Sequence, residues 1–205
     1  MKKIVICSIP MKENVESTVY ISNDQSLPAS GEKYRYPINS FLSQTLSAED
    51  DIKFLLLIKK DTNSFYEKNT ENFKQEIKSI CDKTGAKSSF VLIDTDFSED
   101  KAVHEELMSR IVDQIDVDVH ILADITYGPK DLPIVIFTAL NFAEKFLNCE
   151  VDNIIYGQAE FQGNKVTGTA ICDMIPLYCL STVTNSIKCD DPDKARQLLK
   201  SLLSL

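Results

Sequence analysis

One short segment combines residues able to bind an anion. It reads Asp-Ile-Thr-Tyr-Gly-Pro-Lys and covers residues 124–130. Thr126 and Gly128 suit a tight turn with exposed backbone N–H groups, and Lys130 adds a positive charge where an anion would dock. The same residue types also occur in ordinary turns, where Asp124 and Thr126 would only satisfy the backbone. The segment therefore indicates either an anion site or a plain turn.

The turn is expected between a buried strand and a helix. Residues 119–125 before it are mostly apolar and rich in β-branched types, which predicts a strand. Residues 134–147 after it are apolar with helical spacing, and Asp131 and Pro133 suit the cap and first turn of that helix. In an open α/β sheet, such a turn lies at the carboxyl edge of the strands, where ligands bind. The function is therefore expected at this edge.

The rest of the chain alternates strands with helices. The predicted strands cover residues 3–9, 53–58, 89–93, 119–125, 151–161 and 165–172. The predicted helices cover residues 37–46, 69–84, 100–115, 134–147, 174–187 and 193–205. Residues 162–164 suit a hairpin turn between the last two strands. This pattern predicts an α/β fold, a doubly wound and mainly parallel sheet with a C-terminal antiparallel hairpin and terminal helices, in a single domain over residues 1–205.

The first connection, residues 10–36, is the long one and shows no clear periodicity. Loops of this length in a compact domain are usually functional or disordered. The segment leaves the same sheet edge as the turn at Thr126, so the two are candidates for one shared pocket. Tyr20 and Tyr34 are candidates for stacking on a base, or parts of a simple cover.

Composition and known motifs exclude several classes of protein. The net charge of −9 repels polyanions, so DNA is not an expected partner, although a small phosphate-bearing ligand is compatible with it. The six cysteines lack C-x-x-C spacing, which predicts no metal site, and most of them lie in apolar patterns, which predicts reduced, buried thiols. No apolar run is long enough for a membrane span, and a cytoplasmic protein is expected. Neither G-x-G-x-x-G nor the P-loop motif occurs, and no cofactor is expected.

The Asp-x-Thr-x-Gly sequence between a strand and an apolar helix resembles the signature of CRISPR-associated Rossmann-fold (CARF) domains. The similar branch is the one named for its DxTHG motif, and Tyr127 here stands where that branch usually has His. The similarity covers most of the chain and implies a Rossmann-like sheet. It also includes Ser8 at the end of the first strand, Tyr20, Tyr156-Gly157, Glu160 and residues 171–176.

This resemblance implies a homodimer that binds one cyclic oligoadenylate, the second messenger of type III CRISPR antiviral defence. A ring of four or six identical nucleotides has a two-fold axis that a symmetric dimer can match. The ring would lie between the paired carboxyl-edge loops. The implied ligand-binding residues are Ser8, Ile9, Pro10, Met11, Tyr20, Thr126, Tyr127, Gly128, Pro129 and Lys130.

Some members of this family also cleave their ligand, as ring nucleases. Cleavage needs no metal if the 2′-hydroxyl of the ring is aligned with the adjacent phosphate, and the product ends are then 2′,3′-cyclic phosphates. Ser8, Thr126 and Lys130 are the candidate catalytic residues. No general base is evident, since His104 is expected on a helix and His120 at a strand start, both away from the carboxyl edge. A phenol at Tyr127 could still stack on adenine or bond a ribose hydroxyl.

CARF domains usually precede an effector such as a nuclease or a deaminase, and residues 1–205 contain none. The chain is therefore expected to be an excised sensor domain, or a standalone ring nuclease or regulator. Two other hypotheses stay open: a doubly wound enzyme acting on a nucleotide or phosphorylated metabolite, and an interaction module whose exposed helices bind a partner. An apolar stripe in the last helix also favours a partner: Ala195, Leu198, Leu199, Leu202 and Leu203.

Overall fold

A computed structural model describes the chain except for residues 23, 25, 163–164 and 204–205. The chain divides into two compact units, Met1–Asp173 and Met174–Leu205. The first unit contains the sheet and four long helices, and the second contains two helices. The single domain expected over residues 1–205 would span both units.

The described residues of the first unit form one six-stranded sheet. Its strands are β1 (Lys2–Ser8), β4 (Asp51–Ile58), β5 (Lys87–Asp94), β6 (His120–Asp124), β7 (Glu150–Gln162) and β8 (Lys165–Asp173). They lie in the order β5-β4-β1-β6-β7-β8, parallel throughout except for β8, which is antiparallel to β7. This is the strand order of doubly wound, Rossmann-like sheets. The predicted α/β sheet and its antiparallel hairpin are confirmed, and the tip of the hairpin lies outside the described residues.

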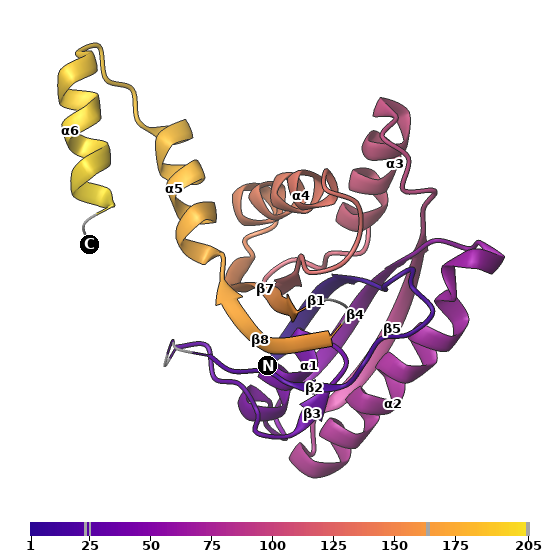
Figure 1. Cartoon of the computed structure of the whole chain (residues 1–205). Coiled ribbons are helices and arrows are strands. Elements are labelled where there is room, and N and C mark those ends of the chain that lie inside the picture. The colour runs from indigo at the N-terminus through magenta and orange to yellow at the C-terminus, as the bar shows by residue number, and fades with distance from the viewer. Residues whose placement is uncertain (23, 25, 163–164, 204–205) are drawn as a thin grey trace. The chain divides into compact units, whose positions relative to one another are not determined.

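Helices cover both faces of this sheet (Figure 1). Helices α1 (Pro37–Thr45) and α2 (Tyr66–Thr84) lie on one face, and α3 (Lys101–Val112) and α4 (Leu132–Phe146) lie on the other. A short 3₁₀ helix, η1 (Thr62–Ser64), precedes α2. Pro37 occupies the first turn of α1, and the Gly85 N–H closes α2 on the Cys81 carbonyl at 2.8 Å, as both residue types predict.

The core fixes where the central strands end. Strands β1 and β4 are almost continuously buried, as expected for strands covered by helices on both faces. On the α1 and α2 face, Phe73 packs edge-on against Tyr36 and Phe54, with ring centroids 4.9 and 5.5 Å apart. Tight packing of this kind holds β1 in register between β4 and β6. The position of Ser8, the last residue of β1, is set in this way.

Part of the first loop is ordered against the sheet, contrary to the absence of any predicted element there. Two short strands, β2 (Thr18–Val19) and β3 (Lys33–Tyr34), pair antiparallel. Ile21 then exchanges two backbone hydrogen bonds with β8, at 3.0 and 2.9 Å. Strands of two residues are too short to show an alternating pattern, so no local signal predicts them.

The second unit consists of α5 (Ile175–Ser186) and α6 (Pro192–Leu202). The Asp191 carboxylate caps α6 by accepting hydrogen bonds from the backbone N–H groups of Asp193 and Lys194. All six cysteines of the chain are free, but Cys179 and Cys189 are exposed, so the expected burial was wrong for this unit, whose helices bury few side chains. None of the described helices combines the length and apolar character needed to cross a membrane.

Candidate functional site at the carboxyl edge

The chain reverses its winding direction between β1 and β6. Strand β1 leads to α1 on one face of the sheet, and the neighbouring β6 leads to α4 on the other face. Ligands of doubly wound proteins bind at such a point, outside the carboxyl ends of the strands. Cys7 pairs in register with Asp124, so Ser8 and the turn after β6 meet at this edge.

Asp124 ties the turn to the start of α1. Its carboxylate is buried and accepts hydrogen bonds from the backbone N–H groups of Thr126 at 2.8 Å and Ile38 at 3.3 Å. Burial raises the pKa of Asp124 to about 6, although the hydrogen bonds from Thr126 and Ile38 act to lower it. Asp124 therefore acts on the backbone of the turn and does not reach solvent.

Thr126 ties the same turn to β7. Its Oγ1 accepts a hydrogen bond from the backbone N–H of Gly157 at 2.7 Å. A β-carbon at Gly157 would lie 2.2 Å from Cγ of Pro37 and 3.2 Å from Cγ2 of Thr126, so only glycine fits between them. The hydrogen bonds of Asp124 and Thr126 are those of a turn that satisfies its backbone, and the Thr126 side chain also hydrogen-bonds the Asp124 carboxylate, which acts to lower the pKa of Asp124.

The centre of the turn lies against Ser8. Gly128 has φ +106°, and a β-carbon there would lie 3.3 Å from Ser8 Oγ and 2.4 Å from a methyl group of Leu132. Ser8 is 2% exposed, and its Oγ has no hydrogen-bond partner among the described residues. Lys130 is exposed and forms no ion pair within the described part of the chain. A free hydroxyl, a free cation and the N-terminus of α4 thus lie along one turn.

A cavity of about 290 Å³ opens beside this turn and is lined by Lys12, Tyr20 and Tyr127 among others. The hydroxyls of Tyr20 and Tyr127 both donate to the Arg35 carbonyl, at 3.2 and 3.1 Å. Burial raises the pKa of both phenols, which keeps them neutral donors. The Lys12 ammonium lies 5.9 Å from the centroid of the Tyr127 ring, and Tyr36 packs against the same ring in a T-shaped arrangement with centroids 6.2 Å apart. Tyr20 and Tyr127 are therefore brought together, as expected for one pocket.

The remaining predicted residues differ in access. Ile9 and Pro10 are buried, and the Pro10 carbonyl accepts a hydrogen bond from the Asn69 side chain at 2.8 Å. Met11 is exposed and Pro129 is half-buried. Contacts of these four side chains with a ligand stay a prediction.

His104 reaches this edge, which the sequence analysis missed. Its Nε2 contacts the Asp131 carboxylate, one residue beyond Lys130. Asp131 makes no side-chain cap on α4, so the predicted capping role was wrong, because its carboxylate turns to the imidazole of α3. The expectation that His104 lies away from the carboxyl edge was also wrong. The available signal was the position of His104. It lies in the first turn of a helix that follows a parallel strand, and such a turn begins at the carboxyl edge of the sheet.

The arrangement can bind an anion and exchange a proton. The turn offers N–H groups, the Lys130 ammonium and the Ser8 hydroxyl to an anion, and the His104–Asp131 pair offers an imidazole held by a carboxylate. No protein-family model and no curated protein matches the chain. The resemblance to CARF domains therefore depends on the residues named in the sequence analysis.

Proposed function

We propose that the chain is a CARF-type sensor that binds a cyclic oligoadenylate of four or six nucleotides at the carboxyl edge between β1 and β6. The observation that carries this proposal is the buried Ser8 Oγ, which lacks a partner and faces the Gly128 turn. An unpaired buried hydroxyl costs about 1–3 kcal/mol. An oxygen of a ligand phosphate or ribose would remove this cost while Lys130 neutralises the phosphate charge.

The distribution of charge supports a small ligand. The chain carries a net charge of −9, whereas Lys12 and Lys130 lie at the cavity and the turn. Local cations on an acidic protein suit a compact phosphate ligand better than an extended polyanion such as DNA. The neutral phenols of Tyr20 and Tyr127 add aromatic surface of the kind that nucleobases contact.

A homodimer follows from the proposed ligand. One two-fold symmetric ring is matched by two copies of the same half-site. Helix α4 carries exposed apolar side chains suited to such an interface, with Ile134 70% and Phe146 63% exposed. The proposal places the dimer in the cytoplasm, where it would control a fused or associated effector of type III CRISPR defence.

We also propose slow cleavage of the ring without a metal at this site. The 2′-oxygen would attack the adjacent phosphorus as the bond to the 5′-oxygen breaks, which leaves a 2′,3′-cyclic phosphate and a 5′-hydroxyl. The 2′-hydroxyl gives its proton to a base, and the departing 5′-oxygen takes one up. Ser8, Thr126 and Lys130 would position and stabilise the phosphate, and the His104–Asp131 pair supplies the imidazole that the turn itself lacks.

Isothermal calorimetry of the full chain with cyclic tetra-adenylate and cyclic hexa-adenylate tests the binding proposal. One ring should bind per two chains. Lys130→Ala should weaken binding by about tenfold or more, as expected for loss of one charge-assisted hydrogen bond, and Lys130→Arg should keep most of it. Absence of heat with both rings would overturn the proposal.

A matched pair of variants at Thr126 tests whether the hydrogen bond between the turn and β7 is needed for binding and cleavage. Thr126→Ala removes the acceptor for the Gly157 N–H and should reduce binding or cleavage, whereas Thr126→Ser keeps this acceptor and should retain both.

Labelled ring incubated with a chelator should still give linear products ending in 2′,3′-cyclic phosphate. Complete retention of the ring would leave a sensor that does not cleave. Tight binding of a linear nucleotide or phosphorylated metabolite in place of the rings would favour the doubly wound enzyme.

A further inference from the structure

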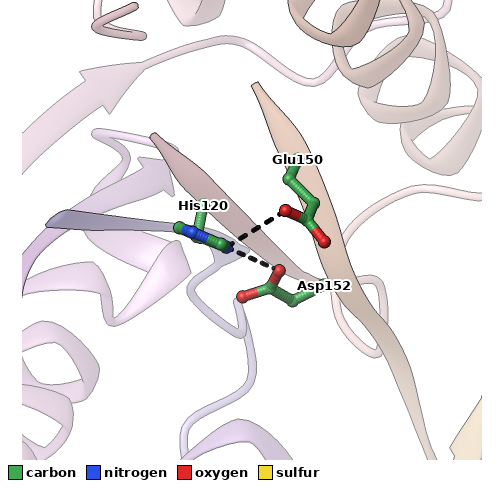
Figure 2. A group of neighbouring side chains, drawn as sticks. All are labelled: His120, Glu150 and Asp152. Atoms are coloured by element: carbon green, nitrogen blue, oxygen red, sulfur yellow. Dashed lines mark hydrogen bonds and ion pairs between the residues drawn. The ribbon is translucent and has the colours of Figure 1, made fainter. Parts of the chain in front are cut away.

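A second group of side chains lies at the opposite, amino edge of the sheet. His120 is the first residue of β6, and Glu150 is the first residue of the parallel neighbour β7. His120 and Glu150 are paired in register, and the pairing shifts so that Asp152 is an extra residue opposite the break between Ile121 and Leu122. Irregular strand positions of this kind change the direction of a side chain. Here the three side chains converge (Figure 2).

The distances suit a shared ion. His120 Nδ1 lies 2.9 Å from Asp152 Oδ1 and 3.9 Å from Glu150 Oε2, and one ligand atom from each residue lies within 4.8 Å of the others. Ligand atoms around a tetrahedral ion at about 2.0–2.1 Å are about 3.3 Å apart. Only small shifts are needed, and Glu150 can make them because its side chain is 76% exposed. His120 and Asp152 are held more firmly, at 33% and 27% exposure.

We propose that His120, Glu150 and Asp152 form a site for one divalent transition-metal ion, with zinc as the best match. An imidazole nitrogen favours zinc and its neighbours over calcium or magnesium, which prefer oxygen ligands alone. The two carboxylates balance the charge of the ion, and water completes its coordination.

No neighbouring cation competes for these carboxylates within the described part of the chain. His120 is the only basic side chain that pairs with them there. Lys3 is paired in register with His120, but its ammonium is bound to Asp50 at 3.1 Å. An ion would thus join the first residues of two parallel strands, on the edge opposite Ser8 and Gly128. The site is independent of the proposed nucleotide pocket, and a chelator would empty it without touching that pocket.

Cobalt(II) titration of the chelator-treated full chain tests this proposal, because cobalt reports its ligands by absorption. One ion should bind per chain, with weak visible bands and without the strong near-ultraviolet band of a cobalt–thiolate bond. This distinction matters because Cys179 and Cys189 are exposed thiols. A thiolate band would assign the metal to cysteine and overturn the proposal.

Three variants complete the test. His120→Gln and Asp152→Asn each remove a proposed ligand and should weaken cobalt and zinc binding by at least about 100-fold. Loss of a residue that only supports a ligand weakens binding by up to about that factor. His104→Gln is the matched control and should bind as the wild type does. Because the chain has only two histidines, zinc should shift the ring resonances of His120 alone in NMR spectra. Unchanged affinity in both ligand variants would show that the group is an ordinary surface hydrogen bond and would overturn the site.

Discussion

The buried carboxyl group of Asp124 should make the stability of the fold depend on pH in a direction unusual for an aspartate. Burial raises its folded-state pKa to about 6, against an ordinary value of 3.8. The folded state therefore binds this proton more tightly than the unfolded state does. Below the unfolded-state pKa, the group is protonated in both states and does not reduce the stability of the fold. As the pH rises through the window from 3.8 to about 6, the free energy of unfolding falls.

The size of the effect follows from the two pKa values. Their difference of about 2 corresponds to about 3 kcal/mol once the group is fully ionised in both states. About 1 kcal/mol of this cost is already present near pH 4.5, because the unfolded carboxyl group ionises first. A change of about 2 kcal/mol is therefore expected between about pH 4.5 and 7.5.

Asp124→Asn isolates this contribution. The Asn side chain cannot ionise. Its oxygen can accept a hydrogen bond, but its NH₂ group can only donate, so it cannot satisfy the backbone N–H groups of both Thr126 and Ile38. The loss of one acceptor costs about 1–3 kcal/mol at every pH. Asp124→Asn should thus be clearly less stable than the wild type near pH 4.5, and the gap should narrow by about 2 kcal/mol near pH 7.5.

Urea unfolding of both proteins across this pH range measures the gap, with the free energy of unfolding taken from linear extrapolation. Asp50→Asn serves as the control, because the pKa of this buried carboxyl group is shifted in the opposite direction. Burial acts to raise the pKa of Asp50, but hydrogen bonds from Ser47 and the ion pair with Lys3 outweigh it and lower the pKa. Because the pKa of Asp50 is lowered from 3.8, its contribution changes only below that value, so the gap between wild type and Asp50→Asn should stay nearly constant from about pH 4.5 to 7.5. Parallel stability curves for the wild type and Asp124→Asn would refute the reasoning.

Three further predictions concern packing and the imidazole. Gly157→Ala should lower the free energy of unfolding by about 1–3 kcal/mol, since its β-carbon would lie 2.2 Å from a proline ring atom, whereas Gly31→Ala, with no atom within 4 Å, should be neutral in the same urea assay. Tyr36→Phe should cost about 1 kcal/mol in that assay by removing the 2.6 Å hydrogen bond to the Asn69 carbonyl. His104→Gln should slow ring cleavage and leave calorimetric affinity unchanged; equal loss of both would contradict a role in proton transfer.

The sequence was sufficient for the sheet where burial leaves a local pattern. Strands β1 and β4 are covered on both faces, so their apolar runs are visible without any knowledge of their neighbours. The contact between Ser8 and the Gly128 turn could also be predicted from the sequence, because the carboxyl ends of parallel strands lie at the same edge of a sheet. The role of Asp124 could not be decided in this way, because a turn and an anion site use the same residue types. Only the hydrogen bonds to Thr126 and Ile38 show what its carboxylate does.

The contacts that the sequence left unpredicted join residues from different elements. His104 and Asp131 are 27 positions apart, and they meet because α3 packs on α4. His120 and Asp152 are 32 positions apart, and they meet through the order of β6 and β7 and a local shift in their pairing. Neither separation has a fixed meaning in a linear motif. Pairs of this kind can be found only once the crossovers and the strand register are known.

Tyr127 and His104 together bear on how closely the chain resembles the DxTHG branch. The Tyr127 hydroxyl is committed to the Arg35 carbonyl and its ring packs near Tyr36, so this side chain holds the first loop against the turn. It is poorly placed to replace an imidazole in proton transfer. His104 brings an imidazole to the same turn from α3 through Asp131. In the cleavage that we propose, the base therefore comes from α3 and not from the motif position.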